Sequence, residues 1–422
     1  MRILLVEQGD PKIRRYVVDK LICNNYRLTL INELNAVWDK QKFDKVILTR
    51  LSNWPYIMEN VIKEHETEKF EGVLCFNEGS IPLANKIAKL LNLPLISKYS
   101  GDSFRFKDRM RVAFESYGVI SPDYKILNSR KEMYALKDWE YPLVLKPSAL
   151  MGSLGVVKVN SYEELPKKIN YPLCADFELN FDGEIYALSE MYSLPSTVLA
   201  EEYIDGKEYS VEGFVFQEEF YPIGITKKFI EKGPFFNEKG HIFPDTSISK
   251  EIRDVIYQEL IKAHKALGLQ NCFTHSEIRL NNNIPYVIEL GARLGGDYIP
   301  RLVDEVLKVD TSDIAIRCAT DRFAKQDRDN QKIDYSNYNG NYASIYFISC
   351  PKEMSGKKFY EIQVEETDFD IVELSSYIEK GERIYTKDNN RIGHIILKTE
   401  SFEETYQLMN DMHKYINIIT QD

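Results

Sequence analysis

Short apolar runs alternate with amphipathic stretches over the first hundred residues of the chain. The apolar runs are Ile3–Val6, Arg27–Ile31, Val46–Thr49 and Val73–Phe76. Helical patterns separate them: one begins at Asp10-Pro11, and two others cover residues 55–68 and 80–92. A capping residue followed by proline is typical of a helix start. This alternation predicts a parallel α/β sheet, here a Rossmann-like domain over residues 1–100.

After this domain, strand-forming residues become more frequent. A connecting helix is expected over residues 101–120, beginning near Asp102 and ending at Gly118. Residues 180–229 are rich in β-branched and aromatic side chains, which favours antiparallel strands. Ser247–Leu267 has the period of an amphipathic helix.

The end of the chain predicts a further lobe, over residues 340–422. Residues 324–341 are polar and rich in turn formers, and we interpret them as a linker. The elements expected after it are three strands and a helix, at residues 342–347, 370–374, 391–398 and 402–416.

Composition narrows the class of protein. The chain has 422 residues, 44% of them hydrophobic and 28% charged, as expected of a globular protein with two or three domains. A net charge of −11 argues against a general nucleic-acid binder, which would need a basic face. No apolar run approaches the roughly 20 residues of a membrane span, and the N-terminus is charged too soon for a signal peptide. The six cysteines form no C-x-x-C pair, which favours reduced thiols and a cytoplasmic protein.

Two apolar, strand-like segments each carry one carboxylate. Glu277 lies in Thr274–Arg279, Glu289 lies in Tyr286–Asp297, and Asn281–Asn283 between them is a hairpin turn signal. Folding this hairpin places Glu277 and Glu289 side by side. Because two adjacent carboxylates repel each other, we expect cations between them. Mg²⁺ prefers oxygen ligands and shares its shell with phosphates, so the pair predicts chemistry on ATP.

Each feature of this hairpin also has a structural interpretation. The two glutamates could lie exposed on a solvated hairpin, but an unpaired charge in an otherwise apolar strand is costly. His275 alternates with Glu277 and Arg279, so all three share one face of the strand. A lone histidine is often a structural residue, and both interpretations of His275 stay open.

Two further segments suggest phosphate and adenine binding. Lys146 ends a strand and precedes a loop with two glycines and two serines, whose N–H groups could wrap a triphosphate. In Leu199–Glu212, the backbone of Tyr203 and Ile204 could pair with an adenine edge, and Glu208 could bind the ribose. Taken singly, each segment is better explained as an ordinary turn between strands.

Taken together, in this order and at this spacing, the three segments resemble the ATP-grasp superfamily over roughly residues 100–310. The shared features are a lysine-bearing glycine loop, an E-E-Φ-Φ-x-G-x-E hinge, and an E…E-x-G-x-R pair of metal strands. Within the superfamily, the chain looks most similar to the carboxylate–amine ligases that include bacterial L-amino acid ligases. Thr274–Arg279 and Ile288–Asp297 carry this similarity, with Pro234–Pro244, which borders the substrate site in that family.

The resemblance implies roles for individual residues. Those that would bind ATP are Lys107, Lys146 and Ser153 around the phosphates, Glu201 at the adenine amino group, the backbone of Tyr203 and Ile204 at the adenine edge, and Glu208 at the ribose. Glu277 and Glu289 would bind Mg²⁺, as two ions for which Mn²⁺ could substitute. Arg293 would stabilise the phosphoryl group, and Arg279 and His275 would lie near the substrates.

The chain departs from the family pattern in two places. Many ATP-grasp enzymes have asparagine two residues after the second metal glutamate, where this chain has Gly291. The second Mg²⁺ shell would then use more water or a different side chain. The glycine loop is also poorer in glycine than usual, with Ala149–Met151 before Gly152, which bears on how the loop closes.

The resemblance also implies a fold and an activity. The expected α/β (α+β) fold has the N-terminal domain, a mobile lid over residues 121–205, an antiparallel catalytic sheet over residues 206–325, and the C-terminal lobe. The expected activity joins two amino acids through an acyl phosphate and releases ADP and phosphate. One alternative is an ATP-grasp ligase with another acceptor, such as a carrier-protein thiol, or bicarbonate as in biotin carboxylase. Another is a nucleotide-binding module without turnover. Amino acids are the expected partners, and a homodimer is left open.

Three acidic residues near the expected substrate side raise the question of substrate charge. Glu78 follows a strand of the first domain, Asp245 follows a Phe-Pro turn, and Asp297 lies just past Arg293. If one of them lines the pocket, a cationic amino acid is favoured. Asp297 could instead cap a helix beginning at Tyr298.

Overall fold

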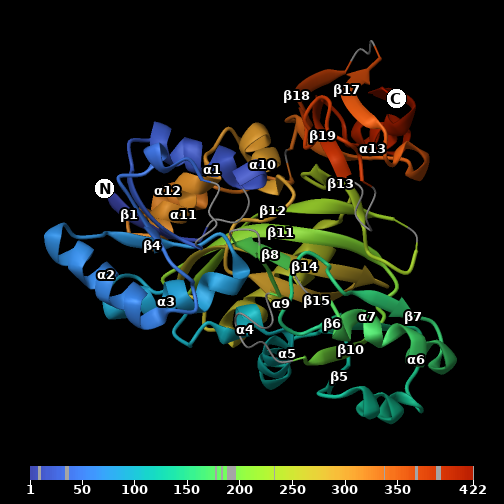
Figure 1. The fold of residues 1–422 in the computed structure, drawn as a ribbon, viewed down its shortest axis with the longest axis horizontal. Coiled ribbons are helices and arrows are strands. Elements are labelled where there is room, and N and C mark those ends of the chain that lie inside the picture. The colour runs from blue at the N-terminus through green and yellow to red at the C-terminus, as the bar shows by residue number, and fades with distance from the viewer. Residues whose placement is uncertain are drawn as a thin grey trace.

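A computed structural model describes residues 1–7, 11–33, 38–175, 178–181, 184–187, 196–231, 233–336, 338–365, 369–385 and 391–421 (Figure 1). Its three largest sheets have four, four and eight strands. The first sheet is the blue N-terminal part of Figure 1, the second lies in the green lobe at the lower right, and the third crosses the centre. Within the described residues, no helix is long and apolar enough to span a membrane.

The N-terminal sheet is parallel, as the alternating pattern predicted. Its strands, in the order β3-β2-β1-β4, are β3 (Lys45–Leu48), β2 (Arg27–Asn32), β1 (Arg2–Val6) and β4 (Gly72–Leu74). Helix α1 (Pro11–Cys23) lies between β1 and β2 along the chain, α2 (Trp54–Thr67) lies between β3 and β4, and α3 (Ile81–Leu90) follows β4. All five residues of β1 are buried, as expected of a strand covered on both faces. β4 ends two residues earlier than expected, and Asp10 lies outside the described residues.

The connecting segment forms two helices rather than the single expected one. α4 (Asp102–Arg105) and α5 (Lys107–Ser116) are separated by Phe106, whose backbone is extended. The Lys107 N–H donates to the carbonyl of Ser148 at 3.0 Å, and its side chain donates to the carbonyl of Leu150 at 2.7 Å. The helix therefore restarts where the chain contacts the loop that follows Lys146.

A separate antiparallel sheet forms the lobe beside this helix. Its order is β5 (Tyr124–Leu127), β10 (Val198–Glu202), β6 (Leu143–Pro147) and β7 (Val157–Val159). Short helices α6 (Leu165–Lys168) and α7 (Asn170–Leu173) follow β7, and β8 (Glu178–Phe181) pairs with β9 (Glu184–Ala187). Leu145, Val157 and Ala200 belong to a hydrophobic cluster confined to this lobe. The lobe thus has its own core.

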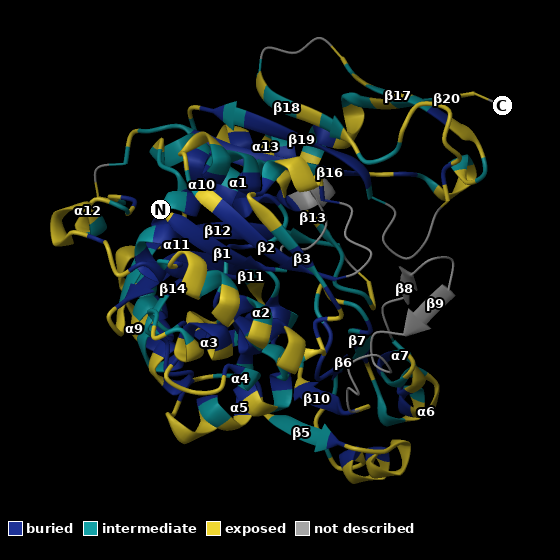
Figure 2. Cartoon of the chain, turned by 60° about the vertical axis from the view of Figure 1, so that its left-hand side comes forward, coloured by how far each residue is buried: buried dark blue, intermediate teal, exposed yellow. Residues whose placement is uncertain are grey.

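The eight-stranded sheet joins the middle of the chain to its end. In order, its strands are β15 (Ile284–Gly291), β14 (Asn271–Asn281), β11 (Lys207–Phe216), β12 (Glu219–Ile230), β13 (Glu238–Phe243), β16 (Tyr342–Ser349), β19 (Arg391–Thr399) and β18 (Asp370–Ser376). The helices that accompany it are α9 (Lys250–Ala266), α10 (Ile299–Leu307), α11 (Thr311–Ala319) and α13 (Phe402–Asp411). Its central strands are largely buried (Figure 2). Leu4 of β1 and Val211 of β11 share one hydrophobic cluster, so the N-terminal domain packs directly on this sheet.

Two expectations for the end of the chain were wrong. Residues 324–341 are not a free linker: they contain α12 (Lys325–Asp329), Ile333 is buried, and the Tyr335 hydroxyl accepts from the Ile225 N–H at 2.7 Å. Two apolar side chains were enough to pack a segment that looks polar overall. The last helix, α13, ends at Asp411 rather than at 416, and β20 (Ile416–Gln421) then pairs with β17 (Lys358–Val364).

Candidate active site

The two carboxylates of the β14–β15 hairpin face each other. Glu277 and Glu289 are register partners in an antiparallel pair, which places their side chains on the same face. Asn282 and Asn283 form the turn with φ values of 50° and 64°, the left-handed conformation that asparagine tolerates. The predicted hairpin and its pairing are confirmed.

Two cations of the chain surround Glu277. Its Oε1 lies 2.7 Å from Lys228 Nζ and 3.5 Å from His275 Nε2. Burial alone would raise its pKa, but Lys228 and His275 hold the pKa of Glu277 well below its usual range. For His275 the effect of burial has the opposite sign and lowers the pKa. The carboxylates of Glu212 and Glu277 outweigh burial and raise the pKa of His275 to about 9. His275 Nδ1 lies 2.7 Å from Glu212 Oε1, so His275 is a buried counter-charge to two carboxylates.

Glu289 has less compensation. Its Oε1 lies 3.0 Å from Lys107 Nζ. Burial raises the pKa of Glu289, the carboxylates of Glu78 and Glu277 raise it further, and Lys107 offsets only part of this. The cations of the chain thus offset burial at Glu277 but not at Glu289.

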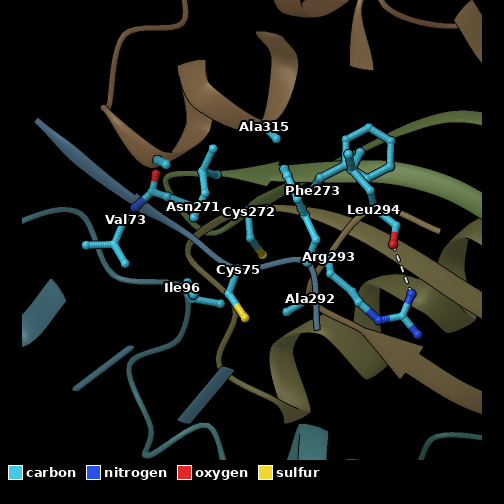
Figure 3. Close-up of a pocket in the computed structure, with 13 residues that line it drawn as sticks. Val73, Cys75, Ile96, Asn271, Cys272, Phe273, Ala292, Arg293, Leu294 and Ala315 are labelled. Atoms are coloured by element: carbon cyan, nitrogen blue, oxygen red, sulfur yellow. Dashed lines mark hydrogen bonds between the residues drawn. The ribbon is translucent and has the colours of Figure 1, made fainter. Parts of the chain in front are cut away.

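Arg293 follows the hairpin and reaches the N-terminal domain. Its Nη2 lies 3.1 Å from Glu78 Oε2. Its Nη1 donates to the carbonyl of Leu294 at 2.9 Å (Figure 3). Arg293 also lines a cavity whose volume is about 20 Å³. The lining is mainly apolar and includes Cys75, Cys272 and Phe273, which Figure 3 labels. This volume is enough for one water molecule, so the cavity is not a substrate site.

Glu201 at the end of β10 is held between two cations. Lys146 Nζ lies 2.6 Å from its Oε2, and Arg111 Nε lies 2.7 Å from its Oε1. Burial would raise the pKa of Glu201, but Arg111 and Lys146 together lower it. Arg111 also donates to the carbonyl of Ile288 at 2.7 Å, which ties the small lobe to the hairpin.

The segment after β10 forms the hinge between the small lobe and the large sheet. The Tyr203 N–H donates to the carbonyl of Pro142 at 3.2 Å. Arg279 donates to the carbonyl of Ile204 at 2.9 Å and to Glu208 Oε2 at 3.0 Å. The carbonyl of Ile204 is therefore occupied by Arg279, whereas its N–H has no partner among the residues that the structure describes.

Residues 139–301 match a protein-family model described as an ATP-grasp domain. The chain contains an ATP-grasp domain. The whole fold is similar to the crystal structure of L-amino acid ligase from Bacillus licheniformis, with a TM-score of 0.81 and 21% sequence identity. That likeness covers 100% of this chain and 99% of the other. The ATP-grasp fold and the α/β class expected from the sequence are confirmed.

Curated relatives share part of this chain. Alanine–anticapsin ligase of Bacillus subtilis (strain 168) is 31% identical over 259 residues, which cover 58% of this chain and 53% of the relative. Dapdiamide A synthase of Enterobacter agglomerans is 24% identical over 263 residues, which cover 59% and 57%. The chain thus spans little more than half the length of these relatives.

A cluster of three carboxylates in the ATP-grasp domain is occupied by an ammonium group. Lys228 Nζ lies 3.1 Å from Glu208 Oε1, 2.6 Å from Glu238 Oε1 and 2.7 Å from Glu277 Oε1. Oxygen atoms of these glutamates lie close enough together to hold a cation. Because the buried lysine already lies among them, this cluster is a lysine site, and the Glu277–Glu289 face is the better metal candidate.

The acidic residues considered for substrate charge are all paired within the chain. Glu78 pairs with Arg293 as described, and Asp245 Oδ2 lies 3.7 Å from Lys227 Nζ. Asp297 makes two bonds to Arg391 of β19, at 2.9 and 3.0 Å. Asp297 does not cap α10, because the capping position is Tyr298 and makes no side-chain cap bond. The preference for a cationic substrate stays a prediction.

Ser153 lies in an exposed turn of the glycine loop, with a left-handed φ of 58°. Gly155 in the same loop has a φ of 76°, and a Cβ there would lie 2.7 Å from the Pro147 ring. A side chain at position 155 would therefore clash with Pro147, the last residue of β6, and displace the loop.

Sequence reasoning missed several charged residues of the site. The missed residues are Glu78 as a partner of Arg293, Arg111, Glu212, Lys228 and Arg391. A lysine inside an otherwise apolar strand was a usable signal for Lys228. Arg111 lies on a polar-looking helix, so nothing local to it indicated burial.

Proposed function

We propose that this protein is an ATP-dependent carboxylate–amine ligase that joins two amino acids through an acyl phosphate and releases ADP and phosphate. The observation that carries the proposal is the face-to-face pair Glu277 and Glu289, with Lys107 against one of them and Arg293 two residues past the strand. The printed names of the relatives support the substrate class, since one is a ligase for alanine and anticapsin.

The residues expected to bind ATP line the junction of the small lobe and the hairpin. Lys107, Lys146 and Ser153 would bind the phosphates, and Glu208 the ribose. The unpartnered N–H of Ile204 suits the adenine edge. Glu201 is held by two cations in the ligand-free chain, so contact with the adenine amino group would require Lys146 to turn toward the phosphates.

The residues present fit Mg²⁺, or Mn²⁺ in its place. Glu277 and Glu289 supply only oxygen donors, as a hard cation prefers, and a cation there would lie between two facing carboxylates. Two ions are the number we propose. When bound, Mg²⁺ offsets negative charge on the phosphate oxygens.

The chain's own residues then serve two steps. In the first, a carboxylate oxygen of one amino acid attacks the γ-phosphorus and the bond to ADP breaks. The Arg293 guanidinium and the Lys107 ammonium would offset charge on the transferring group. In the second, the amine of the other amino acid attacks the acyl carbon, orthophosphate leaves and the amine loses a proton. The small lobe, closing over the site, would keep water from the acyl phosphate.

The test is a screen of amino-acid pairs for ADP, orthophosphate and dipeptide. One ADP should form per amide bond, and ¹⁸O from the substrate carboxylate should appear in the orthophosphate. AMP as the nucleotide product, or unlabelled phosphate, would contradict the mechanism. ADP formation that needs no amino acid would favour another acceptor, such as bicarbonate or a carrier-protein thiol.

A further inference from the structure

We propose that Glu78 of the N-terminal domain supplies a carboxylate oxygen to the metal ion held by Glu289. This inference rests on the proposed function above, and it completes the metal site with a residue from outside the ATP-grasp domain. Gly291 has no side-chain oxygen where many ATP-grasp enzymes have asparagine. The Glu78 carboxylate would supply the missing oxygen ligand.

The environment of Glu78 leaves one oxygen without a partner. Glu78 opens the short 3₁₀ turn η2 (Glu78–Ser80), which follows β4, and it is 4% exposed. Oε2 accepts from Arg293 at 3.1 Å. Oε1 is buried and accepts no hydrogen bond within the part of the chain that the structure describes. A buried carboxylate oxygen without a partner has lost its hydration and gained no hydrogen bond in exchange, so a ligand there is favoured.

The position of that oxygen follows from the strand geometry. Glu289 and Gly291 are two residues apart on β15, so their side-chain directions lie on one face. A Cβ built on Gly291 would lie 2.8 Å from Glu78 Oε1. The unpartnered oxygen therefore lies above β15, on the face that carries Glu289 and Glu277.

The charges at this position favour a cation with oxygen ligands. Glu277 and Glu289 are partners across β14 and β15, and Glu78 Oε1 lies over Gly291, two residues from Glu289 on the same face. Arg293 holds the second oxygen of Glu78 and thereby orients the first, as partners outside the ligand shell do in metal sites. Mg²⁺ takes oxygens in an octahedral shell, and a third carboxylate at this face would supply one of them.

Electron paramagnetic resonance of Mn²⁺ bound with ADP tests this without turnover. The wild-type chain should bind a second Mn²⁺ per nucleotide site, and Glu78→Gln should weaken that second site at least about 10-fold while the first is kept. Glu259→Gln is the matched control, because Glu259 is a buried carboxylate paired with Lys262 elsewhere in the chain. Its two Mn²⁺ sites should be unchanged.

A swap of side chains sharpens the test. Gly291→Asn alone should disturb the site, because its Cβ would clash with Glu78 Oε1. In the double variant Glu78→Ala/Gly291→Asn, the space is free and the amide oxygen lies on the same face, so the second Mn²⁺ should bind more tightly than in Glu78→Ala. No recovery in the double variant would count against the proposal.

Other outcomes separate this inference from the proposed function. If Glu78→Gln keeps the second Mn²⁺ at wild-type affinity, the assignment is wrong, and loss of activity would then come from Arg293. If that variant instead raises only the KM of an amino acid, Glu78 binds a substrate ammonium and the metal assignment is overturned. If no Mn²⁺ binds with ADP in the wild type, the proposed function itself fails.

Discussion

Glu201 and Glu289 are two buried carboxylates of the same site with opposite surroundings. Glu201 has a cation on each oxygen, Arg111 at 2.7 Å and Lys146 at 2.6 Å, and its pKa is lowered. Glu289 has one ion-pair partner, Lys107 at 3.0 Å, and burial, followed by the carboxylates of Glu78 and Glu277, raises its pKa. Both oxygens of Glu201 are paired within the chain, whereas Glu289 is the carboxylate at which we propose a metal ion. The comparison indicates that Glu201 stabilises the fold and that Glu289 is placed to bind a ligand.

The largest expected effect is on turnover. Glu289→Gln should lower ADP formation roughly 1,000-fold or more, because the metal loses a charged ligand at the transferring phosphoryl group. The fold should unfold at a similar temperature, because the change removes the ion pair with Lys107 but also the repulsion from Glu78 and Glu277. Coupled ADP release and thermal unfolding of the same sample measure the two. Near-normal release at saturating Mg²⁺ would make the metal assignment wrong.

Glu201→Gln should act mainly on stability. It leaves Lys146 and Arg111 buried without a counter-charge, which should lower the free energy of unfolding by roughly 3 kcal/mol. Urea unfolding at pH 7 measures this. Asp254→Asn, which removes an exposed pair with Lys250, is the control and should change little. If Glu201→Gln and wild type are equally stable, Glu201 does not stabilise the fold, and the contrast with Glu289 is wrong.

The ion pairs of Glu201 also predict how the stability of the fold depends on pH. Because the folded pKa of Glu201 lies below its ordinary value of 4.5, its contribution is present above pH 4.5 and is lost as the pH falls through the folded value. The stability difference between wild type and Glu201→Gln should therefore narrow as the pH falls below 4.5. Unfolding of both proteins from pH 7 downward tests this. A gap that stays constant into strong acid would contradict it.

The smallest expected effect concerns the glycine loop. Residues 151–155 lie in turns, and Gly152 and Ser153 are exposed, so their amides should exchange quickly without nucleotide. Added Mg²⁺ and a non-hydrolysable ATP analogue should slow that exchange several-fold, while β14 amides in the buried sheet stay unchanged. Equal exchange in both states would argue against a lobe that closes on ATP.

Local signals predicted much of this molecule because they depend on short separations along the chain. The parallel sheet followed from alternating strands and helices, and α9 starts after its cap Ser249, as a helix over Ser247–Leu267 predicted. Errors arose where packing overrode composition. Ile333 and Tyr335 anchor a segment that looked like a linker, and the contact of Lys107 with the glycine loop coincides with a break in the expected helix.

What the sequence determined by itself is the β14–β15 hairpin, since a turn of asparagines between two apolar strands fixes where the chain reverses. Counted from that turn with a period of two, Glu277 would lie opposite Ile288; a β-bulge between Glu277 and Ile278 makes Glu289 its partner instead. Only the tertiary structure decided what surrounds them. Arg111 comes from 90 residues before Glu201, and Glu78 comes from 215 residues before Arg293. The interaction between two charges depends on the distance between them in space. For residues this far apart in the sequence, that distance is set by how the sheets pack and does not follow from the sequence separation.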